Sequence, residues 1–593
     1  MKRYGKKVLS IAMCLLMAIV GMVGSVGCNS EKRGGEAVDK TKTQLYIATY
    51  GGGYGTAFLQ DIEDRFEKWA MDNQKSYEDG KVGVQIYKTA SKSKYTANAL
   101  IDTIESDNYE LYFVTGDSLN EFTDANGNST KLRDISTIVK ADNPFDNNTK
   151  SIEDKLRSEM KNHHNVGTAA NSKYYSLPFV DGGTGLTYDK DVFRVKKLYF
   201  EKGGCPSEFC DFVQNNNANP ATGEFEDYYF IANANSEKSA GPDGLYGTED
   251  DGLPATLAEF QRLLTEMKEA SVASLIWSGE YETEYSPFLA RAFANNHHGL
   301  EESMIPYDAG GENGRATTII TGFDNQGNPQ IKENHLIDID NIADVVKQEG
   351  FYYGLKMFEM ILKSGTVAED AWKSLSHTMT QYVYVSSYPD QKIKDIAFLL
   401  DGTWWENEAD SANSFNDYGP NFYRNKRNFG YFPMPWADES YIGNKYTMAG
   451  GGGSFFVSSR VSDKKAELIK DFIQFAFSDE SLQRMTINIG VPSPYIYEMD
   501  GIPDASEPTV TYADKMSSYT RSFYNLYKNS NIVYPFVERE LFTRVKTVGE
   551  TITYMSSLDA ENKSYTTFPS AWKKNGVTAE QFFTGLYRKA TSK

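Results

Sequence analysis

Several segments carry residue types that nucleotide-binding or hydrolytic enzymes use, but each lacks a part that the chemistry requires. The glycines of 51–56 lie where a dinucleotide-binding fingerprint would stand, yet Thr56 occupies the third glycine position. The segment 449–454 reads AGGGGS and lacks the Lys-Ser/Thr ending of a phosphate-binding loop. Neither a GxSxG nor an HExxH motif occurs. A carboxylate pair of the glycoside hydrolase type stays open, because nothing selects one pair among 81 Asp and Glu residues.

One loop concentrates oxygen atoms that could bind a metal ion. The segment 242–252 contains Asp243, Asp250 and Asp251 among glycines, a composition that can wrap around Ca²⁺. Leu245 stands where an EF-hand needs Asp or Asn, so the loop is either an irregular calcium site or an acidic turn that caps the next helix. The adjacent pairs His163-His164 and His297-His298 are not expected to bind metal, because neighbouring side chains usually diverge. We expect no required cofactor.

Tryptophans at the ends of expected strands suit the stacking of sugar rings. Trp404 and Trp405 follow the strand-like run IAFLL, and two adjacent indole rings cannot easily face one core, so one of them is expected to be exposed. Acidic and amide side chains follow them and could accept hydrogen bonds from sugar hydroxyls. For Trp436, Tyr54 and Phe455 both a core position and a ligand contact stay open. The candidate ligand contacts on these grounds are Tyr54, Trp277, Trp404, Trp405, Trp436 and Phe455.

The composition agrees with an uncharged ligand. The 593 residues hold 61 Lys and Arg against 81 Asp and Glu, a net charge of −20, with 40% hydrophobic and 13% aromatic residues. This is a globular composition. A nucleic-acid partner is not expected, because the chain has no dense run of Lys and Arg to displace counterions.

The N-terminus has the layout of an exported lipoprotein. Four cations within residues 2–7 precede an apolar run from Val8 to Val26, which is typical of a secretory signal, although a membrane-spanning anchor is the alternative. The tetrad ending in Cys28 resembles the bacterial lipobox, with Ser25 in place of the usual Leu. We therefore expect residues 1–27 to be removed, Cys28 to carry lipid, and residues 28–42 to tether the protein to the membrane. The mature charge would be −24, from 57 cations and 81 anions.

Two cysteines remain for the mature domain. Cys205 and Cys210 lie in GGCPSEFC, and in an exported protein this spacing indicates one local disulfide. A zinc site is less favoured, because no second CxxC or His pair follows at ligand spacing.

Strand and helix patterns alternate along the chain and predict α/β structure. In the first part, strands are expected at 44–50, 81–88 and 109–116, with helices at 55–70 and 91–104 between them. Later come a pair of strands around Gly182-Gly183, a helix and strand at 256–277, an inserted β-hairpin within 301–340, and helices at 341–363 and 464–477. Parallel strands joined by helices imply right-handed crossovers.

An ordered set of segments resembles a known protein family. The segments are YYSLPF with GLTYDKDVF, LPATLAEF, IAFLLDGTWW, YFPMP, GGGSFFVSS and IGVPSP. Together they resemble the extracellular solute-binding lipoproteins of bacterial carbohydrate ABC transporters, the family 1 proteins that include maltose-binding protein.

This resemblance implies two discontinuous α/β lobes around a hinge and a central cleft, the periplasmic-binding-protein-like fold. Lobe I would comprise 43–180 and 447–490, and lobe II would comprise 181–446 and 491–593. Gly53, Tyr54 and Asp117 would face the cleft from lobe I, and Trp277 and Trp404 from lobe II.

The resemblance also implies the activity. The protein would not be an enzyme but a monomer on the extracytoplasmic face of the cell membrane that captures a sugar or oligosaccharide and delivers it to the permease subunits of an ABC transporter. The alternatives are a surface glycoside hydrolase and a binding protein for a peptide or another non-sugar solute.

Overall fold

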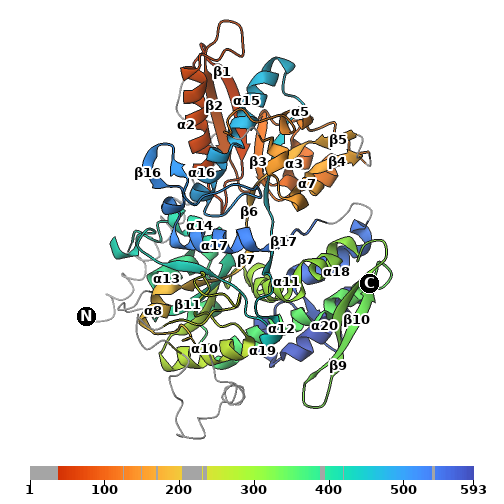
Figure 1. Ribbon diagram of the computed structural model, residues 1–593. Coiled ribbons are helices and arrows are strands. Elements are labelled where there is room, and N and C mark those ends of the chain that lie inside the picture. The colour runs from red at the N-terminus through yellow and green to blue at the C-terminus, as the bar shows by residue number, and fades with distance from the viewer. Residues whose placement is uncertain are drawn as a thin grey trace, which may run out of the picture.

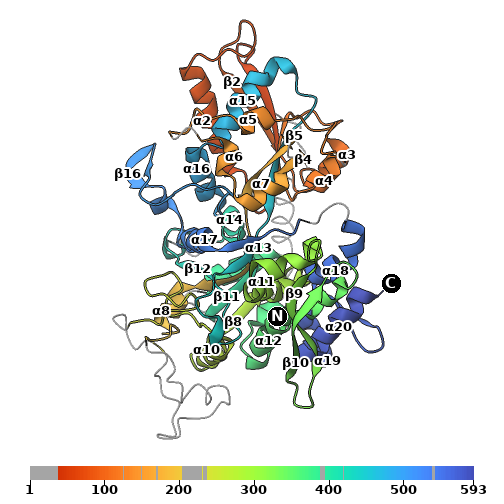
Figure 2. The same cartoon turned by 45° about the vertical axis from the view of Figure 1, so that its right-hand side comes forward.

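The molecule consists of two α/β lobes. The computed structural model describes residues 38–592 apart from 125, 148–149, 169–170, 203–229, 231–236, 388–393, 418–419 and 537–540. Figures 1 and 2 show one lobe above the other, with several chain segments passing between them. The expected α/β fold class with two lobes is confirmed.

Lobe I is built on a five-stranded sheet in the order β2-β1-β3-β14-β6. β1 lies parallel to β2 and β3, whereas β14 is antiparallel to both of its neighbours. The strands are β1 (Thr43–Thr49), β2 (Val84–Ala90), β3 (Leu111–Thr115), β6 (Ser176–Asp181) and β14 (Gly452–Val457). The longer helices of this lobe are α2 (Ala57–Asp72), α15 (Ala466–Ala476) and α16 (Asp479–Ile489). Shorter elements are α3 (Ala97–Thr103), α4 (Leu119–Phe122), α5 (Ser136–Val139), α6 (Ile152–Lys155), α7 (Ser158–His164), β4 (Asn165–Thr168) and β5 (Asn171–Tyr174).

The helix α2 shows why these residues fold as they do. Its apolar residues recur at helical spacing, so Phe58, Ile62 and Phe66 line one buried face. Phe66 packs edge-on against Phe472 of α15, with ring centroids 5.2 Å apart. This packing joins residues separated by about 400 positions into one core.

Lobe II is built on a four-stranded sheet in the order β12-β7-β11-β8. Its strands are β7 (Thr184–Asp189), β8 (Ala273–Trp277), β11 (Ile396–Gly402) and β12 (Phe429–Phe432). Its helices are α8 (Lys190–Val195), α10 (Leu257–Glu269), α11 (Glu282–Asp308), α12 (Glu349–Ser364), α13 (His377–Ser386), α14 (Trp405–Ser411), α17 (Ser518–Asn529), α18 (Phe542–Tyr554), α19 (Phe568–Asn575) and α20 (Ala579–Thr591). β11 runs parallel to β8 and antiparallel to β7.

Two features of the expected organisation take a definite form. Within 301–340, β9 (Arg315–Phe323) and β10 (Pro329–Ile337) pair as an antiparallel hairpin, while 301–308 belong to α11. Tyr495 and Asp504, which belong to the segment 491–593 expected in lobe II, instead contact lobe I. The Tyr495 hydroxyl donates to the Pro178 carbonyl (2.8 Å), and Asp504 pairs with Arg484 (3.1 Å). Two small strand pairs, β15 (Pro503–Asp504) with β16 (Glu507–Thr511) and β18 (Ser557–Leu558) with β19 (Ser564–Tyr565), complete the tail.

Asp181 holds the segments that pass between the lobes. Its buried carboxylate accepts hydrogen bonds from the hydroxyl of Tyr527 (2.5 Å), from the hydroxyl of Tyr534 and from the amide of Gly451 (2.8 Å). Its own amide donates to the Pro492 carbonyl (2.8 Å). Next to it, β13 (Thr447–Ala449) pairs in parallel with β17 (Asn531–Val533). Gly451, Pro492, Tyr527 and Tyr534 therefore all bond to this one residue.

Several expected features lie outside the described residues. These are the signal segment 1–27, Cys28, most of the tether, and the cysteine pair Cys205 and Cys210. In the ranges given above, no helix has both the length and the apolar character to span a bilayer.

We expect Asp181→Ala to lower the free energy of unfolding by about 3–5 kcal/mol, because two buried tyrosine hydroxyls and one amide lose their acceptor. Asp181→Asn should cost less, since its amide oxygen still accepts. Urea unfolding followed by circular dichroism measures both. Asp463→Asn, whose side chain is 95% exposed, is the control and should stay within about 0.5 kcal/mol of the parent. Equal stability of all three variants would contradict this role.

Candidate binding site between the lobes

A loop from each lobe meets its counterpart beside the crossing segments. The loop after β1 contains Gly53 and leads into α2, and the loop after β11 contains Trp404 and leads into α14. The side-chain amide of Asn407 donates to the carbonyl oxygen of Gly53 (3.2 Å). A Cβ atom on Gly53 would lie 2.4 Å from Cδ1 of Trp404, so the approach requires a glycine. The structure thus brings together Gly53 and Trp404, both singled out from the sequence.

Two aromatic rings form the contact between these loops. Tyr54 packs edge-on against Trp404, with ring centroids 5.8 Å apart and an interplanar angle of 76°. Tyr54 is buried, whereas Trp404 is half-buried. Burial, and then the charge of Asp181, raises the pKa of Tyr54 well above its usual value, so the hydroxyl stays protonated and can donate.

A polar network adjoins Trp404 on the lobe II side. The Gln381 side-chain amide donates both to Asp401 Oδ2 (3.0 Å) and to Glu408 Oε2 (3.1 Å). His377 Nε2 lies 3.8 Å from Glu408 Oε1. Burial, and then the nearby Glu408, raises the pKa of Asp401 well above its usual value. The network therefore offers both donors and acceptors.

Tyrosines surround this network. The Tyr285 hydroxyl is hydrogen-bonded to Asp401, and the ring of Tyr281 lies 5.4 Å from that of His377. The charge of Glu408 contributes, after burial, to a raised pKa of Tyr50. Rings, amides and carboxyl groups side by side suit a neutral ligand that carries many hydroxyl groups.

The sequence did not point to Gln381, His377, Tyr281 or Tyr285. Tyr281 directly precedes α11, Tyr285 lies on α11, and His377 and Gln381 lie on α13. No local pattern marks them as ligand contacts. The acceptor-rich run after Trp405, in contrast, was visible in the sequence and supplies Asn407 and Glu408.

Asp117 lies on the loop after β3, at the same end of the sheet as the loop after β1. Its carboxylate contacts His163 Nε2 (2.5 Å) and accepts from the Leu119 amide (2.8 Å). Burial alone would raise its pKa, but His163, through its charge and hydrogen bond, and then His164 hold the pKa of Asp117 at about 2. Burial lowers the pKa of His164 to about 3, which keeps this imidazole neutral.

Three predicted contacts are instead core residues. Trp277 packs edge-on against Trp372 and Phe358, and its ring is fully buried. Trp405 is buried too, because the first turn of α14 directs it onto the sheet while its neighbour faces the other lobe. Phe455 packs inside lobe I, with its ring centroid 4.9 Å from that of Phe113. The expectation that these rings line the cleft is therefore corrected. Trp277 and Phe455 lie on strands whose sheets are covered by helices, so their side chains point into the core.

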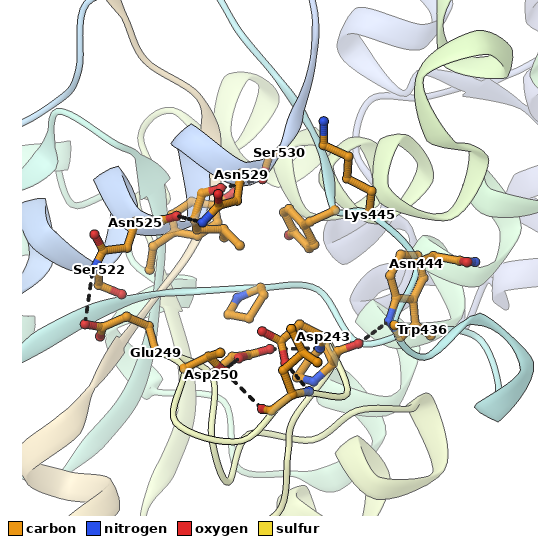
Figure 3. Close-up of a pocket in the computed structure, with 18 of the residues that line it drawn as sticks. Asp243, Glu249, Asp250, Trp436, Asn444, Lys445, Ser522, Asn525, Asn529 and Ser530 are labelled. Atoms are coloured by element: carbon orange, nitrogen blue, oxygen red, sulfur yellow. Dashed lines mark hydrogen bonds between the residues drawn. The ribbon is translucent and has the colours of Figure 1, made fainter. Parts of the chain in front are cut away.

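Trp436 lies at a separate pocket of about 620 Å³ in lobe II. Figure 3 shows this pocket between α17 and the acidic loop 242–250. The indole N–H of Trp436 donates to the Pro242 carbonyl (2.8 Å), so the side chain holds the loop in place.

The acidic loop bonds largely to itself. Asp250 Oδ2 accepts from the Asp243 amide (3.0 Å), and Asp251 Oδ2 accepts from the Gly247 amide (2.8 Å). Burial raises the pKa of Asp250 above its usual value. Calcium binding by these three carboxylates stays a prediction.

The fold was compared with those of known proteins. No protein-family model matches the chain, and neither does any curated protein. A solved structure described under xylan utilization by the thermophilic bacterium Caldanaerobius polysaccharolyticus is similar with a TM-score of 0.50 and 12% identity, covering 92% of this chain and 99% of that one. A chitin oligosaccharide binding protein (TM-score 0.47, 11% identity, 90% and 94% covered) is also similar. So is the GacH receptor of Streptomyces glaucescens (0.48, 11%, 92% and 97%). The first likeness spans nearly the whole of both chains and shows a shared fold.

We expect Gly53→Ala to separate the lobes at this contact. The added methyl group meets the Trp404 ring at 2.4 Å, an overlap that costs about 1–3 kcal/mol unless the loops move apart. Small-angle X-ray scattering should then show a larger radius of gyration than for the parent. Gly549→Ala, where no atom lies within 4 Å, is the matched control and should scatter like the parent. Identical scattering by both variants would contradict the contact.

The raised pKa of Asp401 predicts a pH dependence of stability. Above pH 3.8, the ordinary value, the unfolded chain releases this proton while the folded protein keeps it, so stability falls as pH rises toward the folded pKa. Asp401→Asn removes the group. The parent should therefore lose more unfolding free energy than the variant between about pH 5 and about pH 8.

Guanidinium unfolding at the two pH values measures this difference. Asp463→Asn, with its exposed carboxylate, should change with pH as the parent does. Parallel behaviour of Asp401→Asn and the parent would refute the raised pKa of Asp401.

Proposed function

We propose that the protein is a receptor that binds a sugar or oligosaccharide between its two lobes and delivers it to an ABC permease. The observation that carries this proposal is the meeting of Tyr54 of lobe I with Trp404 of lobe II beside the Asp401–Gln381–Glu408 network. The shared fold and the ordered segments that resemble carbohydrate-binding proteins support it.

Binding follows from the division of the site between lobes. Trp404 offers a ring face for a sugar, while Gln381 and Glu408 offer a donor and an acceptor for its hydroxyl groups. Lobe I adds Tyr54 and the backbone around Gly53. A ligand that contacts both sets favours the closed arrangement, because neither lobe alone completes the site.

The location and partners are part of the same proposal. The signal-like N-terminus and Cys28 support a monomer anchored by lipid to the extracytoplasmic face of the cell membrane. In that position the closed, loaded receptor would dock on permease subunits. Calcium in the acidic loop would be structural, because that loop lies at a separate pocket.

One observation favours a second candidate. Asp401, whose pKa is raised by burial, is linked through Gln381 to a second carboxyl group, Glu408, and glycoside hydrolases use such pairs. A surface glycoside hydrolase would therefore use the same site.

We expect Trp404→Ala to lower the affinity for the oligosaccharide that the parent protein binds most tightly at least about tenfold, because the stacking face is lost. Isothermal titration calorimetry with malto-, xylo- and chito-oligosaccharides measures this. The control is Tyr554→Ala, which removes a 51% exposed aromatic side chain of α18, and this variant should bind the oligosaccharide like the parent.

Incubating the parent protein with the same oligosaccharides separates the receptor from the glycoside hydrolase. Binding without release of new reducing ends supports the receptor, whereas turnover that Glu408→Gln abolishes assigns the hydrolase. Unchanged affinity of Trp404→Ala would remove the site assignment.

A further inference from the structure

Two adjacent histidines at the end of α7 turn toward one carboxylate. His163 Nε2 lies 2.5 Å from Asp117 Oδ2, and His164 Nε2 lies 3.9 Å from the same oxygen. The two imidazole rings are nearly perpendicular, with centroids 5.1 Å apart. The divergence expected of neighbouring side chains is thus corrected, because the helix ends at His164 and the chain turns there into β4.

Each of these side chains is held by a second contact. Nδ1 of His164 is hydrogen-bonded to the Ser176 hydroxyl (2.6 Å), which leaves Nε2 directed at Asp117, and the side chain is 1% exposed. The ring of His163 stacks on Phe536 at a centroid distance of 3.5 Å. Asp117 Oδ1 accepts from the Leu119 amide. Such supporting contacts orient the ligands of metal sites.

A simple ion pair accounts for only part of this arrangement. His163 and Asp117 alone would satisfy one another. The pair does not require a second, fully buried imidazole whose free nitrogen is aimed at the same oxygen atom. Ligand atoms of the three residues all lie within 4.8 Å of one another.

We propose that Asp117, His163 and His164 bind a divalent transition-metal ion of the zinc class. Two imidazole nitrogens and one carboxylate oxygen form a donor set that Zn²⁺ accepts, with a fourth position left for water. Bond lengths of about 2.0–2.2 Å would be reached by small movements that replace the hydrogen bond between His163 and Asp117.

The site would also connect to the crossing segments. Phe536, which covers His163, stacks on Tyr534 (5.4 Å, 6°), and the Tyr534 hydroxyl donates to Asp181. An ion here would hold the end of α7 and the loop after β3 against the segment that follows β17. This inference goes beyond the proposed sugar binding and does not depend on it.

The test titrates untagged mature protein, stripped with a chelator, with ZnCl₂ by calorimetry, and with Co²⁺ by absorption spectroscopy. We expect one ion per chain and visible bands typical of low-coordinate Co²⁺. His164→Gln and Asp117→Asn should each weaken zinc binding at least about tenfold and remove the bands. His163→Gln gives a third variant if either of the other two fails to fold; like Asp117, His163 is half-buried, whereas His164 is buried.

The matched control is His335→Gln, which alters a histidine of β10 that pairs with Asp344 and should bind zinc like the parent. Absence of zinc binding in the parent would overturn the proposal. Binding that survives Asp117→Asn and His164→Gln in folded protein would overturn it too, by placing the ion elsewhere. Either result leaves oligosaccharide binding untouched, so the two proposals fail separately.

Discussion

The arrangement of the two lobes depends on the buried carboxylate of Asp181. Burial raises the pKa of Asp181 because burying a charged carboxylate costs free energy. Hydrogen bonds from Tyr527, Tyr534 and Gly451 offset this cost. These partners come from separate stretches of the chain that pass between the sheets. This acceptor therefore ties the last residue of β6, at the end of the lobe I sheet, to Gly451, Tyr527 and Tyr534.

The candidate site follows from that constraint. Once the sheets face one another, the loop after β1 and the loop after β11 are close enough for Gly53 to contact Trp404. Only a glycine allows that approach, since any Cβ would overlap the indole ring. The polar side chains of Gln381 and Glu408 then belong to lobe II, and the aromatic ring of Tyr54 belongs to lobe I. A receptor that closes over its ligand needs such a division.

Much of the fold was readable from local pattern. The strands β1, β3, β8 and β11 and the helices α2 and α10 lie where alternation and helical periodicity predicted them. Periodicity did not show whether a side chain at the end of a strand is buried in the core or faces the other lobe. Trp404 and Trp405 are neighbours of identical type, yet one faces the other lobe and one the core, because a single step along α14 rotates the side chain by about 100°.

By itself the sequence determined the class of architecture and the pair of strands around Gly182-Gly183, since hydrophobic spacing is a local property, and its family resemblance singled out Gly53, Tyr54 and Trp404. Tertiary structure alone decided that Trp277 and Phe455 are core residues, that Gln381 and His377 join Glu408, and that His163 and His164 converge on Asp117. Those relations link residues tens to hundreds of positions apart, and only packing of the two lobes fixes their distances.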